Sequence, residues 1–148
     1  MQRTNRWMVV VLLLIAALQV TGCGQAAVVA APKSGPVVVE KAEGSEFNRV
    51  RLTEKAAKRI NVQTAKIVEE QMNGQAYKVV PYSSLIYGLK GETWIYTSPE
   101  ALVFVRQLVK VDSIAGEKAF LADGPAAGTA VATVGVPELY GADTGVGK

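Results

Sequence analysis

The chain has 148 residues, of which 49% are apolar and 20% are charged, a balance typical of a globular protein. It contains no histidine, and Cys23 is its only cysteine. These absences exclude histidine-based acid–base catalysis, Cys-His nucleophile systems, zinc sites made of Cys and His, and disulfide frameworks. We therefore expect a protein that is not an enzyme and that uses no cofactor and no metal.

The formal net charge of +3 does not indicate a nucleic-acid partner. Arg3 and Arg6 lie in a segment that we expect to be removed, and without them 14 basic residues face 13 acidic ones. A mature chain so close to neutrality is not suited to bind a polyanion. We therefore expect no nucleic acid among the partners.

Residues 1–22 have the features of an export signal. Two arginines precede the unbroken apolar run of residues 8–18, which is short for a membrane span, and small residues follow it. The end of the segment, Val20-Thr21-Gly22-Cys23, resembles the lipobox of bacterial lipoproteins. This resemblance implies that Cys23 is acylated and begins a mature protein anchored in the bilayer, on the periplasmic or extracytoplasmic face of the bacterial cell membrane. A plain secretory signal or an uncleaved anchor with a coincidental cysteine is the alternative.

Residues 23–46 are expected to form a lipidated tether. The segment is rich in Ala, Val and Gly, contains Pro32 and Pro36, and shows no sustained period of 2 or 3.6. As a flexible coil, residues 24–46 would span about 25–30 Å, which holds the folded part clear of the headgroups. The three valines at 37–39 are interpreted as extended linker, with a short strand as the alternative.

Residues 47–141 are expected to form one small β-rich domain, and residues 142–148 a tail. The first element is a short helix that Thr53 caps and whose last turn carries Lys58 and Arg59, where the helix dipole favours cations. The stretch is locally basic. Lys55 and Arg59 are candidates for a contact with anionic headgroups or an acidic partner, and a solvated helix face is the alternative.

After the helix the pattern changes to short strands separated by turn residues. A polar turn is predicted at 69–74, and the loop Gly88-Leu89-Lys90-Gly91 predicts a hairpin. Seven strands are expected, at 62–68, 77–80, 84–87, 92–97, 102–111, 118–122 and 129–134. Residues 136–140 are predicted to form a closing turn or a single helical turn. Six to seven short strands with one short helix predict a mainly β fold, a small antiparallel barrel or sandwich.

The aromatic residues of the predicted hairpin are candidates for a contact with a partner. Trp94 and Tyr96 are two residues apart and would share one face of a strand, and Tyr87 lies across the hairpin. The three rings belong either to the core, which is the simpler interpretation, or to an aromatic contact patch.

Four motifs carry a resemblance to a known family: Val80-Pro81-x-x-x-Leu85, Gly91-x-x-Trp94-Ile95-Tyr96, Phe104-Val105-Arg106 and Val109-x-Val111. They look like the C-terminal part of periplasmic adaptor subunits, the membrane fusion proteins of the HlyD/RND efflux type. Residues 135–147 resemble the end of the same adaptors, and residues 52–65 resemble the start of their membrane-proximal portion. In that family the start and the end form one β-rich membrane-proximal domain, and the barrel, lipoyl-like and helical-hairpin domains lie between them.

Here only residues 69–79 join the start to the end, so the resemblance implies a membrane-proximal domain trimmed of the other three. It implies a non-enzymatic envelope lipoprotein that docks on or assists a membrane transporter subunit. The alternative is a free-standing binding or structural lipoprotein with no transporter partner. An exposed apolar or aromatic patch would favour docking.

The resemblance also predicts the pairing of the strand at 62–68. In the adaptors the first strand of the domain depends on late strands, and shortening the connection preserves that pairing at little entropic cost. We therefore expect residues 62–68 to pair with a strand from the C-terminal half. An up-and-down meander would indicate an unrelated β lipoprotein.

Overall fold

The computed structural model of the chain describes residues 35–41 and 47–146. They belong to one compact unit. The export signal, Cys23 and much of the expected tether lie outside the described residues. Within the described part of the chain, no helix has the length and the apolar character needed to cross a membrane.

The described residues fold mainly as β structure, which confirms the predicted class. The strands are β1 (Val37–Lys41), β2 (Asn48–Leu52), β3 (Gln63–Lys66), β4 (Val68–Met72), β5 (Gln75–Pro81), β6 (Ile86–Tyr87), β7 (Thr93–Glu100), β8 (Val103–Ala115), β9 (Lys118–Asp123) and β10 (Ala130–Val134). The helical elements are α2 (Glu54–Arg59), the 3-10 turn η2 (Tyr82–Ser84) and α3 (Val136–Thr144).

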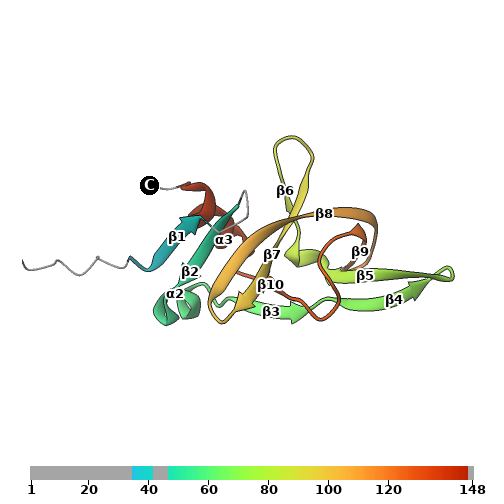
Figure 1. Cartoon of the computed structure of the whole chain (residues 1–148), viewed down its shortest axis with the longest axis horizontal. Coiled ribbons are helices and arrows are strands. Elements are labelled where there is room, and N and C mark those ends of the chain that lie inside the picture. Colours follow the sequence, from blue (N-terminus) through green and yellow to red (C-terminus); the bar gives the residue numbers. More distant parts are fainter. Residues whose placement is uncertain (1–34, 42–46, 147–148) are drawn as a thin grey trace, which may run out of the picture. The chain divides into compact units, whose positions relative to one another are not determined.

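Seven strands form a curled antiparallel sheet in the order β3-β10-β7-β8-β9-β5-β4 (Figure 1). The two end strands of this sheet are consecutive in the chain, because only Ile67 separates β3 from β4. The N–H of Ile67 donates to the carbonyl of Thr129 at 2.9 Å, and the N–H of Gly128 donates to the carbonyl of Ile67 at 2.8 Å. Ile67 is thereby fixed at the point where the sheet curls back on itself into a half-barrel.

The predicted long-range pairing is confirmed. β3 runs antiparallel to β10, with Ala65 opposite Val131, and β10 lies between β3 and β7. The fold is therefore not a simple meander, because a strand from the first half of the domain depends on the last strand.

The long strand β8 joins the two halves of the sheet. Its first part pairs with β7 and with β2, which places Phe104 opposite Val50, and its second part pairs with β9. The register with β9 shifts on both sides of Val111. Such irregularities bend a strand and increase its twist, which accounts for the curl of the sheet here.

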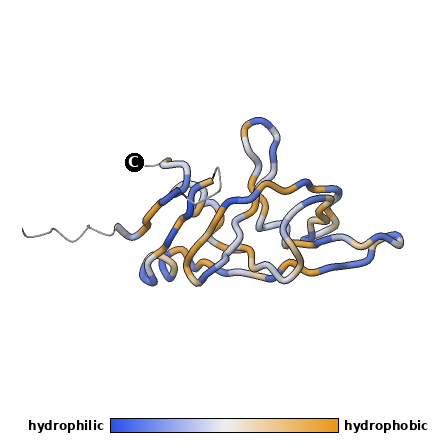
Figure 2. The backbone as a smooth tube through the Cα atoms, in the orientation of Figure 1, coloured by the Kyte–Doolittle hydropathy of each residue, from blue (hydrophilic) through white to orange (hydrophobic). Residues whose placement is uncertain are grey.

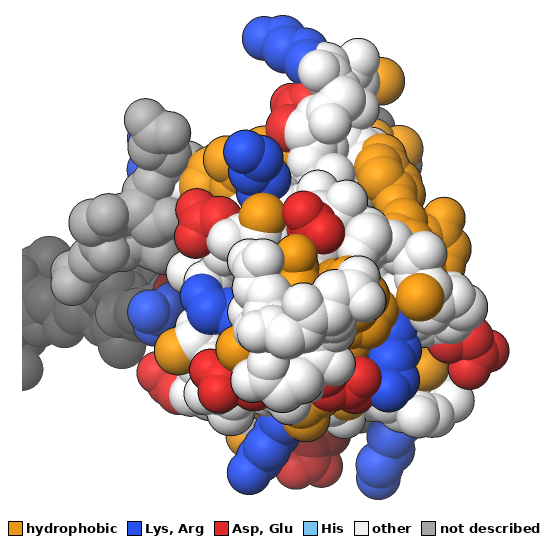
Figure 3. Space-filling view, turned by 90° about the vertical axis from the view of Figure 1, so that its right-hand side faces the viewer, with side chains coloured by type: hydrophobic (Ala, Val, Ile, Leu, Met, Phe, Trp, Pro, Cys, Tyr) orange, Lys and Arg blue, Asp and Glu red, His pale blue; other side chains and the backbone are white. Residues whose placement is uncertain are grey.

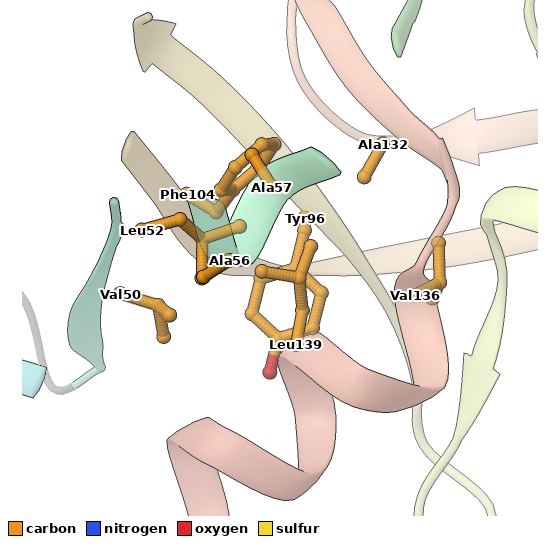
Figure 4. Close-up of a cluster of buried hydrophobic side chains, with 9 residues drawn as sticks. All are labelled: Val50, Leu52, Ala56, Ala57, Tyr96, Phe104, Ala132, Val136 and Leu139. Carbon is orange, nitrogen blue, oxygen red and sulfur yellow. The ribbon is translucent and has the colours of Figure 1, made fainter. Parts of the chain in front are cut away.

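Strand alternation divides the buried side chains into two cores. Ile95 and Val131 point to the inner side of the half-barrel, and their neighbours Tyr96 and Ala132 point to the outer side. On the outer side, α2, α3 and β2 cover the sheet (Figure 4). The outer core consists of Val50, Leu52, Ala56, Ala57, Tyr96, Phe104, Ala132, Val136 and Leu139.

The short helix begins as predicted. The Thr53 side chain accepts a hydrogen bond from the N–H of Ala56 at 3.2 Å, and Lys58 and Arg59 lie in the last turn. Ala56 and Ala57 are buried, which directs Lys55 and Arg59 to solvent.

The segment at 37–41 differs from its interpretation as linker, because it forms β1. The strand pairs with β2 over its whole length, with Val39 opposite Val50. β2 was not predicted either, although Val50 and Leu52 are buried and the intervening Arg51 is exposed, which is strand alternation. β1 therefore extends the outer part of the sheet, and the described structure begins before residue 47.

The predicted polar turn at 69–74 is also wrong in its first part. Residues 69–72 belong to β4, and the turn is confined to Asn73 and Gly74, which have φ values of 53° and 79°. Asn-Gly is the usual pair for a two-residue hairpin loop with positive φ. β4 and β5 form an arm that extends beyond the core, with a hydrophilic tip (Figure 2), so the strand carries polar residues on both faces.

Candidate functional site

A buried acidic side chain links the last helix to the centre of the sheet. The carboxylate of Asp143, on α3, accepts hydrogen bonds from the hydroxyl of Tyr96 at 2.8 Å and from Nδ2 of Asn48 at 3.0 Å. Nε of Arg106 lies 3.2 Å from the same carboxylate, without the alignment of a hydrogen bond, so this contact is an ion pair. The Asp143 side chain is fully enclosed, which makes this polar cluster a fixture of the fold rather than an open acid or base.

Three aromatic rings surround the Arg106 guanidinium. Its central carbon lies 5.0 Å from the ring centre of Trp94, 5.4 Å from that of Phe47 and 5.7 Å from that of Tyr140. The rings of Phe47 and Trp94 meet edge to face at 4.9 Å. Cation–π contacts of this kind stabilise a partly desolvated arginine. The cluster therefore connects β2, β7, β8 and α3.

The environment of Tyr96 keeps its hydroxyl protonated. Burial raises the pKa of Tyr96 far above its ordinary value, and the hydrogen bond to Asp143 and the negative charge of Asp143 raise it further, while Arg106 lowers it in part. A protonated hydroxyl is the hydrogen-bond donor that the Asp143 carboxylate needs. The Tyr96–Asp143 hydrogen bond therefore has the protonation states that it requires, and it contributes to holding the fold together.

The three predicted aromatic contact residues differ in their exposure to solvent. Tyr96 is completely buried, so its assignment to a partner contact is wrong, and the core interpretation is confirmed. Trp94 is half-buried against Phe47 and Arg106, whereas Tyr87 is 52% exposed. Two alternating residues, 94 and 96, do share a face as expected, but α3 covers part of that face.

The predicted hairpin is confirmed, with β6 paired to β7 and the loop at 88–91 projecting from the sheet (Figure 1). Leu89 in this loop is fully exposed, and Tyr87 and Tyr82 are 52% and 46% exposed. The pKa of Tyr87 is raised, first by partial burial and then by its neighbour Tyr82. We call Tyr82, Tyr87 and Leu89 the hairpin surface. Figure 3 shows hydrophobic side chains gathered below the projecting loop.

Lys55 and Arg59 line a groove beside α2, at the edge of the outer core. The groove has a volume of about 660 Å³. It is formed by Pro36, Val37, Thr53, Lys55, Ala56, Arg59 and Ile60, which we call the α2 groove. The carbonyl of Pro36 accepts hydrogen bonds from the N–H of Thr53 at 3.1 Å and from its hydroxyl at 3.2 Å, so the beginning of the described chain is fixed to the start of the helix.

Sequence reasoning missed the polar cluster, because Asp143 lay in the segment assigned to the tail. α3 in fact runs from Val136 to Thr144, across that boundary. The signal was present: Val136, Leu139 and Asp143 are spaced three and four apart, which places the carboxylate on the same buried stripe of a helix as two apolar residues.

No family model, no curated protein and no solved structure matches the chain. The resemblance to the adaptors therefore has no support from these comparisons. Among residues 35–41 and 47–146, no three His, Cys, Asp or Glu side chains lie close enough together to hold a metal ion.

Proposed function

We propose that the chain is an exported lipoprotein, anchored through an acylated Cys23, whose β domain docks on a membrane transporter subunit without catalysing a reaction. The observation that carries this proposal is the hairpin surface. Leu89 lies in the projecting loop at 88–91 with its whole side chain in water, and Tyr87 on β6 and Tyr82 on η2 are also exposed. Exposed aromatic and apolar side chains gathered on a projection are typical of protein contacts, because their burial by a partner is favourable.

The strand order supports the family resemblance behind the proposal. The resemblance predicts that the strand after the short helix pairs with a late strand, and β3 pairs with β10 in this way. The enclosed polar cluster supports a non-catalytic role, because the Asp143 carboxylate is turned inward and has three partners.

The test is site-specific photocrosslinking in the cells that produce the protein. p-Benzoylphenylalanine replaces Leu89 in one variant and Tyr87 in a second. The matched control carries it in place of Gln75, which is also exposed and follows the turn of the β4–β5 arm. We expect crosslinks from positions 89 and 87 to an integral membrane protein that mass spectrometry identifies as a transporter subunit, and none from position 75.

Two outcomes would contradict the proposal. Crosslinks that join only copies of this chain, or that link it to a soluble envelope protein, would favour the free-standing lipoprotein. The absence of any crosslink at positions 87 and 89, in a sample where the protein is folded and membrane-associated, would show that the hairpin surface does not bind a partner.

A further inference from the structure

The side chains of the α2 groove suit a partner surface that has a negatively charged layer with an apolar layer behind it. Pro36, Val37 and Ile60 supply apolar surface, and the exposed Lys55 and Arg59 stand beside it, four residues apart on one side of the helix. Long basic side chains of this kind extend their charged ends to a polar layer while their stems cover apolar groups. An acidic lipid matches this arrangement, because its headgroup would face the basic side chains and its acyl chains would face the apolar ones.

The two cations are available for such a partner. In the described part of the chain, the ion pairs are those between Arg106 and Asp143 and between Lys118 and Glu70. Lys55 and Arg59 therefore have no carboxylate partner there. Lys58 on α2 and Arg51 on β2 are also exposed. The exposed acids nearby are Glu54 on α2 and Glu40 on β1, so the described surface around the groove has an excess of positive charge.

The position of the groove in the chain indicates which surface reaches it. The described structure begins at residue 35, and Pro36 is a wall of the groove. Twelve peptide units connect Cys23 to Gly35, and even fully extended they reach at most about 43 Å. An acyl anchor at Cys23 therefore keeps the groove near the bilayer, at a high effective concentration of headgroups.

We propose that the α2 groove docks on anionic phospholipid headgroups of the membrane that holds the anchor, with Lys55 and Arg59 as the residues that contact lipid phosphate. The inference rests on the proposed lipid anchor and adds an orientation to it: β1 and α2 face the membrane. Each basic residue at an anionic bilayer surface contributes about 1 kcal/mol, so the pair shifts the ratio of docked to undocked domain by about 30-fold.

The experiment uses the full mature lipoprotein reconstituted in vesicles of phosphatidylcholine, with or without phosphatidylglycerol. Lys58→Cys places one free thiol on α2, since the thiol of Cys23 is acylated, and it carries an environment-sensitive fluorophore. Lys110→Cys, on β8, carries the same fluorophore as the positional control. We expect the label at position 58 to shift to an apolar emission and to be quenched by lipid-borne quenchers only in anionic vesicles, whereas the label at 110 stays in water.

Charge reversal then identifies the contact residues. Lys55→Glu with Arg59→Glu should lower the docked-to-undocked ratio by at least about 30-fold, because loss of the two cations alone accounts for that factor and the new carboxylates are repelled by the lipid. Lys90→Glu with Lys110→Glu changes the net charge by the same amount at exposed sites away from the groove and should leave the ratio unchanged. High salt should weaken the docked state without releasing the anchored protein.

Each contrary result has a distinct meaning. A protein that resists a salt wash while the label at 58 stays in water in every vesicle would overturn the docking and leave the anchor intact. An equal shift in neutral vesicles would overturn the role of the two cations, and a shift produced by a soluble acidic peptide in place of anionic lipid would assign the groove to a protein partner. Release of the protein from all vesicles would overturn the anchor, and the docking with it.

Discussion

The hydroxyl of Tyr96 donates a hydrogen bond to the carboxylate of Asp143 over 2.8 Å, across 47 positions of the chain, and both residues are buried. Tyr96 belongs to a central strand and Asp143 to the last turns of α3. The bond therefore attaches the C-terminal helix to the middle of the sheet at one point. Arg106 and Asn48 approach the same carboxylate, so four elements depend on one side chain.

Removal of the Asp143 carboxylate should destabilise the domain strongly. Asp143→Ala leaves Arg106 partly buried without its counter-charge and Tyr96 without an acceptor, and we expect a loss of about 3 kcal/mol in the free energy of unfolding. Tyr96→Phe should cost about 1 kcal/mol, because two partners of Asp143 remain. Urea denaturation of both variants and of the double variant measures the coupling. Asp112→Ala, at an exposed site on β8, is the control, and equal stability of Asp143→Ala and this control would contradict the role of the cluster.

The raised pKa of Tyr96 predicts a loss of stability at alkaline pH. The native state holds the Tyr96 proton beyond the pH at which an unfolded tyrosine, with a pKa of about 10, releases it. The contribution of the Tyr96 proton to the free energy of unfolding is complete below a pH of about 10. It falls as the pH rises above this value, with a slope of up to about 1.4 kcal/mol per pH unit. Denaturation curves between pH 8 and pH 11 should show a slope that is smaller in Tyr96→Phe. An identical slope in both proteins would contradict this assignment.

The end of the domain can be located by truncation. A chain that ends after Gly141 lacks Asp143 and the last turn of α3, and we expect it to lose about as much stability as Asp143→Ala, about 3 kcal/mol. A chain that ends after Val146 keeps every described contact of α3 and serves as the control. Thermal unfolding at matched concentration compares the two. If both melt with the parent protein, residues 142–146 behave as the tail that the sequence indicated.

The proposed lipid anchor predicts the cell fraction in which a Cys23→Ala variant is found. Cys23→Ala removes the acylation site, and the protein should move from the membrane fraction to the soluble envelope or the medium. Two or more acyl chains hold a protein on a bilayer, at about 0.8 kcal/mol per buried methylene group, and none would remain. Fractionation with a salt wash, followed by immunoblotting, gives the result. A variant that stays in the washed membranes would contradict acylation at Cys23.

Metal ions should not stabilise the protein. The chain has no histidine, its one cysteine is the proposed acylation site, and Met72 is the only methionine outside residues 1–22. Addition of zinc or copper should therefore leave the melting temperature of the mature protein unchanged, and so should a chelator. A stoichiometric rise of the melting temperature with either ion would reveal ligands that the sequence does not indicate.

Local chemistry was enough to predict much of the fold. Thr53 caps α2, Gly88 and Gly91 bound the hairpin loop, and the seven expected strands correspond to β3 and β5 to β10. These features depend on residues close together in the sequence. The family resemblance added the one correct long-range prediction, the pairing of β3 with β10.

The failures have two different causes. Val38 and Val39 form a strand only because they pair with β2, which lies beyond residues 42–46. The missed part of β4 was a local error, because Asn73-Gly74 is a hairpin pair and β5 follows it directly. Tyr96 looked like a possible surface aromatic until α3 covered it. Of the candidate contact residues, Tyr87, Lys55 and Arg59 were placed at exposed positions, whereas the polar cluster was invisible without tertiary structure.

The turn of the β4–β5 arm is a place where the chain can become longer without a change in the sheet. The turn at Asn73 and Gly74 lies at the end of an extended projection, and a Cβ atom added at Gly74 would meet no other atom within 4 Å. β3, which precedes the arm, pairs with β10, and the second half of β5 pairs with β9, and neither pairing involves the turn. Each doubling of an inserted flexible segment costs only about 0.6 kcal/mol in closure entropy. The arm is consequently a position where an entire additional module could be accommodated without altering the sheet that carries it.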